Sequence, residues 1–249
     1  MESPIDKFGS YVMLMGRVFS VPTKWRIFFK QLIEEIYKLG VDSTWIVIII
    51  SIFMGSIMCL QVALNITSPL LPAYALGYTV RETLILEFSS SVMCLILAGK
   101  VGSNIASEIG TMRITEQIDA LDIMGINSAS YLILPKVVAM MLFIPILASI
   151  SIILGIVGGY FVAYFTDITN VTTFETGIQF DFKPFLITYA IIKSVIFAFV
   201  ICSIASFYGY NVDIKGGSLE VGKASTDSVV ISSVMILLLD ICLTKLILQ

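Results

Sequence analysis

Residues 98–125 read AGKVGSNIASEIGTMRITEQIDALDIMG and form a long polar passage between two strongly apolar blocks of the chain. Read as a helix from about Thr111, the passage has one narrow apolar face, made by Ile114, Ile118 and Leu121. A second face carries acids at i, i+3 and i+6, which are Glu116, Asp119 and Asp122. Between two membrane spans, such a helix would lie at the membrane surface. It either docks on another protein there or is an ordinary solvated loop helix.

The composition on either side of this passage is that of a membrane protein. The 249 residues are 57% hydrophobic and 13% charged, and the mean hydropathy is +0.97. A soluble domain carries roughly 25% charged residues, so a polytopic membrane protein is indicated. The net charge of −3 gives no basic surface for nucleic acid. The chain has no histidine, the commonest metal ligand and general base, and we expect neither a metal nor another cofactor.

The sequence also lacks the usual motifs of catalysis. The four cysteines are isolated within apolar runs and form no CxxC pair, so neither a zinc site nor a disulfide framework is indicated. A search for the phosphate loop GxxxxGK[ST], for HExxH and for GxSxG finds none of them. We therefore expect a protein that is not an enzyme and cannot hydrolyse ATP unaided.

Five apolar stretches approach the twenty or so residues that a bilayer core requires. They are about Trp45–Leu64, Thr83–Ile105, a stretch within Tyr131–Phe165 that starts after Pro135, Pro184–Phe207 and Ser228–Leu248. Before them, Lys24–Leu39 has aromatic residues at helical spacing and cations near its start. This pattern favours an amphipathic helix in the membrane interface over a soluble hairpin. The predicted fold is a single all-α domain over residues 1–249, in which 1–42 are cytoplasmic or interfacial and 43–249 are transmembrane.

The remaining segments are predicted as connections. Residues 1–22 are mixed with proline breakers, residues 65–82 form a short link, residues 166–183 are polar with room for a short helix, and Tyr208–Thr226 is a glycine-containing loop. Pro145 is expected to kink the third span, where Gly155, Gly158 and Gly159 allow close helix packing.

The lysines and arginines predict the orientation in the membrane. Eleven of them lie before the first span, in the 98–136 region or in the Tyr208–Thr226 loop, whereas only Arg81, Lys183 and Lys245 lie on the other side. Positive loops face the cytoplasm, so the N-terminus is predicted to be cytoplasmic and the C-terminus periplasmic.

Three charges lie inside apolar stretches: Glu87, Lys193 and Asp240. Each would cost about 3 kcal/mol at the centre of a bilayer, even on lenient scales. Such groups usually face a polar cavity, a partner charge or a substrate. A structural ion pair, or a side chain close enough to a span end to reach the interface, is the alternative.

Two blocks of this sequence resemble the MlaE family of permease subunits, which belong to ABC transporters that move lipid between bacterial membranes with MCE proteins. The first block is ASEIGTMRITEQIDALDIMGIN followed by YLILPK, and the second comprises Lys193-Ser194, Gly209-Tyr210, Gly216-Gly217, VGKASTDSVVISS, Asp240 and Leu243-Thr244. The resemblance covers about residues 45–249. The early Glu-Leu-Gly-Pro of the family is Glu87-Phe88-Ser89-Ser90 here, the basic residue often found before that glutamate is Leu86, and the family's Ala-Gly-Arg is Ala98-Gly99-Lys100.

The resemblance implies the partners and the substrate. It implies a homodimer in the bacterial inner membrane, a cytoplasmic ATPase subunit that binds ATP, an MCE-domain protein on the periplasmic side and a phospholipid substrate. In some members a small STAS-domain protein binds the ATPase. The segment 108–125 would then be the coupling helix on the ATPase, with Glu108, Arg113, Glu116, Gln117, Asp119 and Asp122 as contacts. Glu87, Lys193 and Asp240 would lie near the lipid headgroup in the cavity.

Two other function classes remain open at this level. A secondary carrier or channel would move its substrate without an ATPase, although we find no internal repeat of the kind that such folds often carry. A membrane enzyme acting on lipid would need a nucleophile and base that the sequence does not provide. Dependence of transport on an ATPase separates the first alternative from an ABC permease.

Overall fold

A computed structural model describes residues 4–20, 25–65, 72, 74–166 and 170–248. Its described residues are helical with short connections, and five helical runs are long and apolar enough to cross a membrane. Trp25–Asn65, Ala75–Ile114, Ser128–Phe165, Pro184–Tyr210 and Ile214–Ile247 are these runs. The prediction of an all-α polytopic membrane protein is therefore confirmed. Residues 21–24, which include the start of the predicted amphipathic helix, and residues 66–71 of the predicted link lie outside the described residues.

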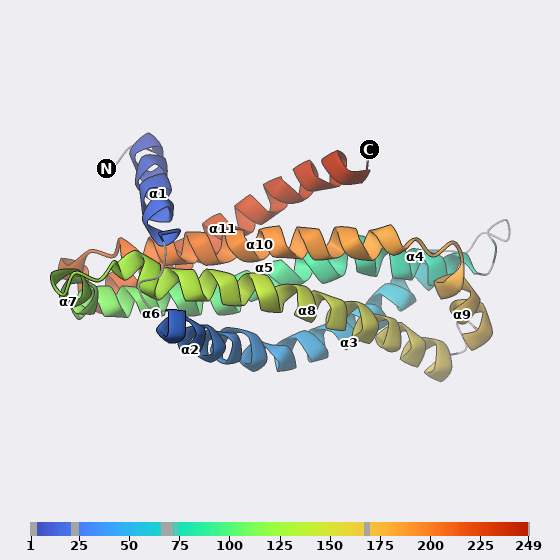
Figure 1. Ribbon diagram of the computed structural model, residues 1–249. Coiled ribbons are helices and arrows are strands. Elements are labelled where there is room, and N and C mark those ends of the chain that lie inside the picture. Colours follow the sequence, from blue (N-terminus) through green and yellow to red (C-terminus); the bar gives the residue numbers. More distant parts are fainter. Residues whose placement is uncertain (1–3, 21–24, 66–71, 73, 167–169, 249) are drawn as a thin grey trace.

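The first run joins the predicted amphipathic helix and the first predicted span into one helical run. α2 (Trp25–Glu35), the π-helical turn η1 (Ile36–Val41) and α3 (Asp42–Asn65) follow one another without a break. In Figure 1 α2 and α3 lie along the same side of α8. The mixed N-terminal segment contains a further helix, α1 (Pro4–Val18), which the sequence analysis missed. The Tyr11 hydroxyl of α1 donates a hydrogen bond to Ser203 Oγ over 2.9 Å, which holds this helix against the bundle.

The second run is longer than predicted at both ends. It consists of α4 (Ala75–Thr83), η2 (Leu84–Val92), α5 (Met93–Leu97), η3 (Ala98–Gly102) and α6 (Ser103–Ile114), where η2 and η3 are π-helical. Residues 75–82, expected to be a connection, are thus helical. The continuous helix expected from Thr111 is also wrong. Glu116 adopts a left-handed φ of 60° and separates α6 from α7 (Gln117–Ile123).

The third run, α8 (Ser128–Phe165), starts before Pro135 rather than after it. Asn127 precedes the helix, and its side chain accepts a hydrogen bond from the Ser130 N–H at 3.3 Å, which is a typical N-cap. α8 then packs along α3. The predicted close packing is confirmed, because a Cβ at Gly55 would overlap the Gly155 carbonyl and a Cβ at Gly158 would overlap the Ile52 carbonyl. A bend at Pro145 stays a prediction.

The last part of the chain contains less loop than predicted. α9 (Val171–Gln179) is the short helix for which the sequence left room, and α10 (Pro184–Tyr210) follows it. The predicted glycine loop at Tyr208–Thr226 is wrong, because η4 (Ile214–Gly216) and α11 (Gly217–Leu248) take up most of it. Figure 1 shows α7 and the start of α11 at one end of the bundle, and α4 and α9 at the other. α11 diverges from the bundle toward the C-terminus.

Candidate functional site

The three intramembrane charges meet although they come from three different helical runs. Glu87 lies in η2, Lys193 in α10 and Asp240 in α11. Lys193 Nζ forms an ion pair with Asp240 Oδ1 and lies 3.4 Å from Glu87 Oε1. The lysine side chain is fully buried, whereas 44% of the Glu87 side chain is exposed. We call these three residues the charge cluster.

Neighbouring polar groups complete the surroundings of the charge cluster. The Ser91 hydroxyl lies 2.8 Å from Asp240 Oδ1 and 3.3 Å from Glu87 Oε2, so its single proton is shared between the two carboxylates. The Tyr189 ring lies 5.1 Å from Lys193 Nζ, and its hydroxyl is 2.8 Å from Thr244 Oγ1. Sequence reasoning missed Ser91 and Tyr189. The available signal was their spacing, since both lie four residues from a cluster member on the same helix.

Side chains donate hydrogen bonds to backbone carbonyls within the π-helical segment η2. The hydroxyls of Ser89 and Ser90 donate to the carbonyls of Ile85 at 3.3 Å and Leu86 at 3.1 Å. The Leu86 carbonyl also accepts a hydrogen bond from Lys193 Nζ at 3.1 Å. π-helical turns are frequent at functional sites. In this chain one occupies the position where the resembling family usually has Gly-Pro.

The predicted coupling residues divide into exposed and internally paired groups. Glu116 and Gln117 are exposed at the α6–α7 turn, and Asp122 is exposed at the other end of α7, where Ile123 is 87% and Met124 is 64% exposed. Arg113 and Asp119 form an ion pair with each other across the turn. Asp122 Oδ1 accepts a hydrogen bond from the Ser128 N–H at 3.3 Å. The exposed residues are free to meet a partner, while the Arg113–Asp119 pair shapes the turn.

Glu108, which we expected to contact the ATPase, is instead mostly buried and paired with lysines of this chain. Its carboxylate lies 2.9 Å from Lys136 Nζ and 2.8 Å from Lys38 Nζ, and Lys136 Nζ lies 2.6 Å from Glu35 Oε1. Lys136 is 2% exposed. We call these four residues the ion network. It ties α2 and η1 to α6 and α8 at the end of the bundle that carries α7.

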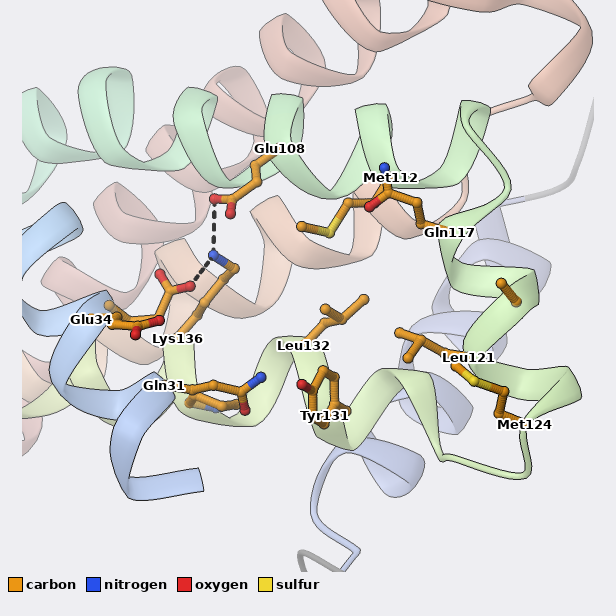
Figure 2. A pocket seen from close by; sticks show the side chains of 13 residues that line it. Gln31, Glu34, Glu108, Met112, Gln117, Leu121, Met124, Tyr131, Leu132 and Lys136 are labelled. Atoms are coloured by element: carbon orange, nitrogen blue, oxygen red, sulfur yellow. Dashed lines mark hydrogen bonds and ion pairs between the residues drawn. The ribbon is translucent and has the colours of Figure 1, made fainter. Parts of the chain in front are cut away.

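A pocket of about 410 Å³ opens beside this ion network, and Figure 2 shows Lys136 reaching Glu108 across it. Its walls come from α2, α6, α7 and α8, and Leu121 and Met124 of the α7 region close one side. The Oε2 atom of Glu35 is buried and has no hydrogen-bond partner. Because residues of α7 and α2 line the same pocket, a movement of α7 would change the surroundings of α2.

No group of His, Cys, Asp and Glu residues in the described part of the chain could hold a metal ion. The cysteines there are unpaired, and only Cys242 is exposed.

Comparison with known proteins identifies the family. The family model "Permease MlaE" matches residues 32–246. The chain belongs to the MlaE permease family. All members of the charge cluster and of the ion network lie within the matched residues.

Relatives of this MlaE-family permease carry consistent names. A "Probable ABC transporter permease protein" of Rickettsia bellii is 33% identical over 221 residues, covering 88% of this chain and 84% of the relative. One of Synechocystis is 30% identical, with coverage of 95% and 89%. The "Intermembrane phospholipid transport system permease protein MlaE" of Haemophilus influenzae is 31% identical, with coverage of 94% and 88%. The chain is thus a membrane-embedded ABC transporter permease, which implies an ATPase partner.

Proposed function

We propose that this permease moves phospholipid between the inner and outer membranes of a bacterium, driven by a separate cytoplasmic ATPase subunit. The charge cluster carries the proposal. Ionisable groups inside a membrane are costly and usually face a substrate or a water-filled space. Glu87 is half exposed among apolar helices, as a headgroup contact requires. The printed name of the Haemophilus relative supports phospholipid as the cargo.

A lipid cargo also suits the apolar surfaces of the spans. A two-chain lipid buries about thirty CH₂ groups worth about 0.8 kcal/mol each, or roughly 25 kcal/mol, so its tails must stay out of water during transport. α11 is the span with the smallest buried share, and its exposed side chains within residues 230–241 are apolar. They include Val230, Ile231, Val234, Leu237, Leu238 and Ile241. Two facing copies would enclose a cavity lined by such surfaces, with Glu87, Lys193 and Asp240 near the headgroup.

The proposed assembly has a definite orientation. The N-terminus and α7 face the cytoplasm, where the ATPase binds nucleotide, and the C-terminus faces the periplasm, where an MCE-domain protein receives or delivers lipid. The lysines and arginines predominate on the α7 side, which supports this orientation. The permease itself needs no cofactor.

The α6–α7 turn is our candidate for contact with the ATPase. Glu116 is exposed at this turn, and at the other end of α7 the Asp122 carboxylate and the apolar side chains of Ile123 and Met124 are exposed as well. A partner that binds this turn would push on the base of α6 and on α8, as in rigid-body coupling between subunits. The ion network would transmit this displacement to α2.

ATP dependence tests the proposed function. The permease–ATPase complex is placed in vesicles, and transfer of a labelled phospholipid to the MCE partner is measured with ATP, without ATP and with a hydrolysis-deficient ATPase. We expect transfer only with ATP and the active ATPase. We expect Asp240→Asn to lower the transfer rate at least fivefold, because Lys193 then loses its closest carboxylate. Equal transfer without the ATPase would favour a secondary carrier or channel instead.

The coupling contact has its own test. Ile123→Asp places a charge on the exposed tip of α7, and we expect the ATPase to co-purify in much smaller amounts because an apolar contact is lost. Leu219→Asp is the matched control, since Leu219 is 85% exposed in α11 rather than α7. Normal co-purification and normal transport by Ile123→Asp would remove α7 from the proposed interface.

A further inference from the structure

The charge cluster presents its three members unequally. Lys193 is completely buried, Asp240 has 16% of its side chain exposed and Glu87 has 44% exposed. A molecule that approaches the cluster therefore meets the Glu87 carboxylate first. The positive charge lies behind it.

Lys193 has no hydrogen-bonding capacity left for a ligand. An ammonium group carries three N–H donors. Those of Lys193 are directed to Asp240, to the Leu86 carbonyl at 3.1 Å and to Glu87 at 3.4 Å, while the Tyr189 ring covers the group at 5.1 Å. A lipid phosphate would have to displace one of these partners in order to reach it.

Arg81, six residues before Glu87, is also buried and engaged within the protein, although its Nε has no hydrogen-bond partner. It is 1% exposed. It donates to the carbonyls of Ile178 at 2.6 Å and Phe180 at 2.8 Å and forms an ion pair with Glu82 at 2.6 Å. Neither buried cation is therefore available to a phosphate.

Glu87, in contrast, has accepting capacity to spare. Its contacts with Lys193 and Ser91 are 3.3–3.5 Å long, which is the weak end of the hydrogen-bond range. A carboxylate has about four lone-pair positions, and part of this one faces outward. With all three groups ionised, one cation and two carboxylates give the charge cluster a formal net charge of −1. It therefore attracts a cation that carries hydrogen-bond donors and repels an anion.

We propose that the charge cluster selects phospholipids whose headgroup carries a primary ammonium, as phosphoethanolamine does, over headgroups with a net negative charge such as phosphoglycerol. This inference rests on the proposed lipid transport. The ammonium donates hydrogen bonds to Glu87, and its charge offsets the excess carboxylate. A choline headgroup has the charge but no N–H donor, so it ranks between the other two.

The test measures which lipids are transferred. The permease–ATPase complex is placed in vesicles containing equal amounts of ethanolamine, choline and glycerol phospholipids with identical acyl chains. Mass spectrometry then gives the headgroup composition of lipid passed to the MCE partner in the presence of ATP. We expect about tenfold enrichment of ethanolamine over glycerol lipid, the ratio that roughly 1.4 kcal/mol of differential charge interaction produces.

Two variants test whether the Glu87 carboxylate is responsible for the headgroup preference. Glu87→Gln keeps the size and hydrogen-bonding shape of the side chain but removes its charge, and we expect the enrichment to fall below threefold. Glu175→Gln is the matched control on an exposed residue of α9, and it should keep the wild-type ratio. If Glu87→Gln fails to fold, the wild-type composition still decides the matter.

The possible results distinguish the headgroup inference, the role of Glu87 and the proposed function from one another. ATP-dependent transfer that reproduces the vesicle composition, or that favours glycerol lipid, would overturn the headgroup inference and leave lipid transport standing. Enrichment that persists unchanged in a folded Glu87→Gln variant would overturn the role of Glu87. The absence of any ATP-dependent transfer would overturn both the inference and the proposed function.

Discussion

Lys136 and Lys193 are both buried lysines, and each is held between two carboxylates from other helical runs. Lys193 meets Glu87 and Asp240 among the membrane spans, and Lys136 meets Glu35 and Glu108 at the α7 end of the bundle. A buried cation costs several kcal/mol unless it is paired and hydrogen-bonded. Each lysine therefore fixes the position of the helices that bring its partners.

The residue-scale prediction concerns Lys136. We expect Lys136→Met to lower the stability by about 3–5 kcal/mol, because Glu35 and Glu108 are left close together without their shared cation. The thermal unfolding midpoint in detergent measures this loss. Lys30→Met is the control, since Lys30 is 80% exposed and its contact with Glu34 is 3.9 Å long. Equal midpoints for the two variants would show that Lys136 is not a structural centre.

Sequence reasoning singled out Glu87, Lys193 and Asp240 because each charge stands out against apolar neighbours. It did not single out Lys136 or Glu35, which lie near polar segments where a charge is unremarkable. Glu108 was chosen as a contact for the ATPase, although the structure engages it internally. Exposure and pairing depend on helices distant in sequence, so a local pattern does not reveal them.

At the scale of elements, glycine and serine set the distance between α3 and α8. The Ser51 and Ser151 hydroxyls are 2.9 Å apart, and Ser56 donates to the Gly158 carbonyl at 2.9 Å. Small side chains allow this approach, which brings helix backbones into direct contact. The glycine pattern of the third span made the packing predictable, but the partner helix was not.

The element-scale prediction tests this contact. Gly55→Ala places a Cβ against the Gly155 carbonyl, and we expect it to lower the stability by about 1–3 kcal/mol through overpacking. Gly222→Ala in α11 is the control, because nothing lies within 4 Å of the added carbon and alanine favours the helix by about 1 kcal/mol. In detergent, denaturation should show that Gly55→Ala lowers the free energy of unfolding and that Gly222→Ala raises it. A neutral Gly55→Ala variant would mean that the helices separate freely.

At the scale of the whole molecule, the orientation in the membrane remains a prediction. We expect a cysteine at Lys7 to react with a membrane-impermeant maleimide from the cytoplasmic side only, and a cysteine at Lys245 from the other side only. Both positions are exposed, and Cys242→Ser removes the one exposed native thiol. Right-side-out and inverted vesicles make the comparison. Labelling of both positions from the same side would rule out an odd number of spans.

The sequence by itself determined that this chain is an all-α membrane protein with five spans, because burial in hydrocarbon requires long apolar stretches whose backbone groups are satisfied within helices. It also indicated the family, because ordered motifs are a property of the linear chain. Only the tertiary structure brought Glu87, Lys193 and Asp240 into one cluster, broke the coupling segment at Glu116 and placed Glu108 inside an ion network. These features arise where separate helices pack, since the pairing of a charge depends on neighbours that are remote in sequence.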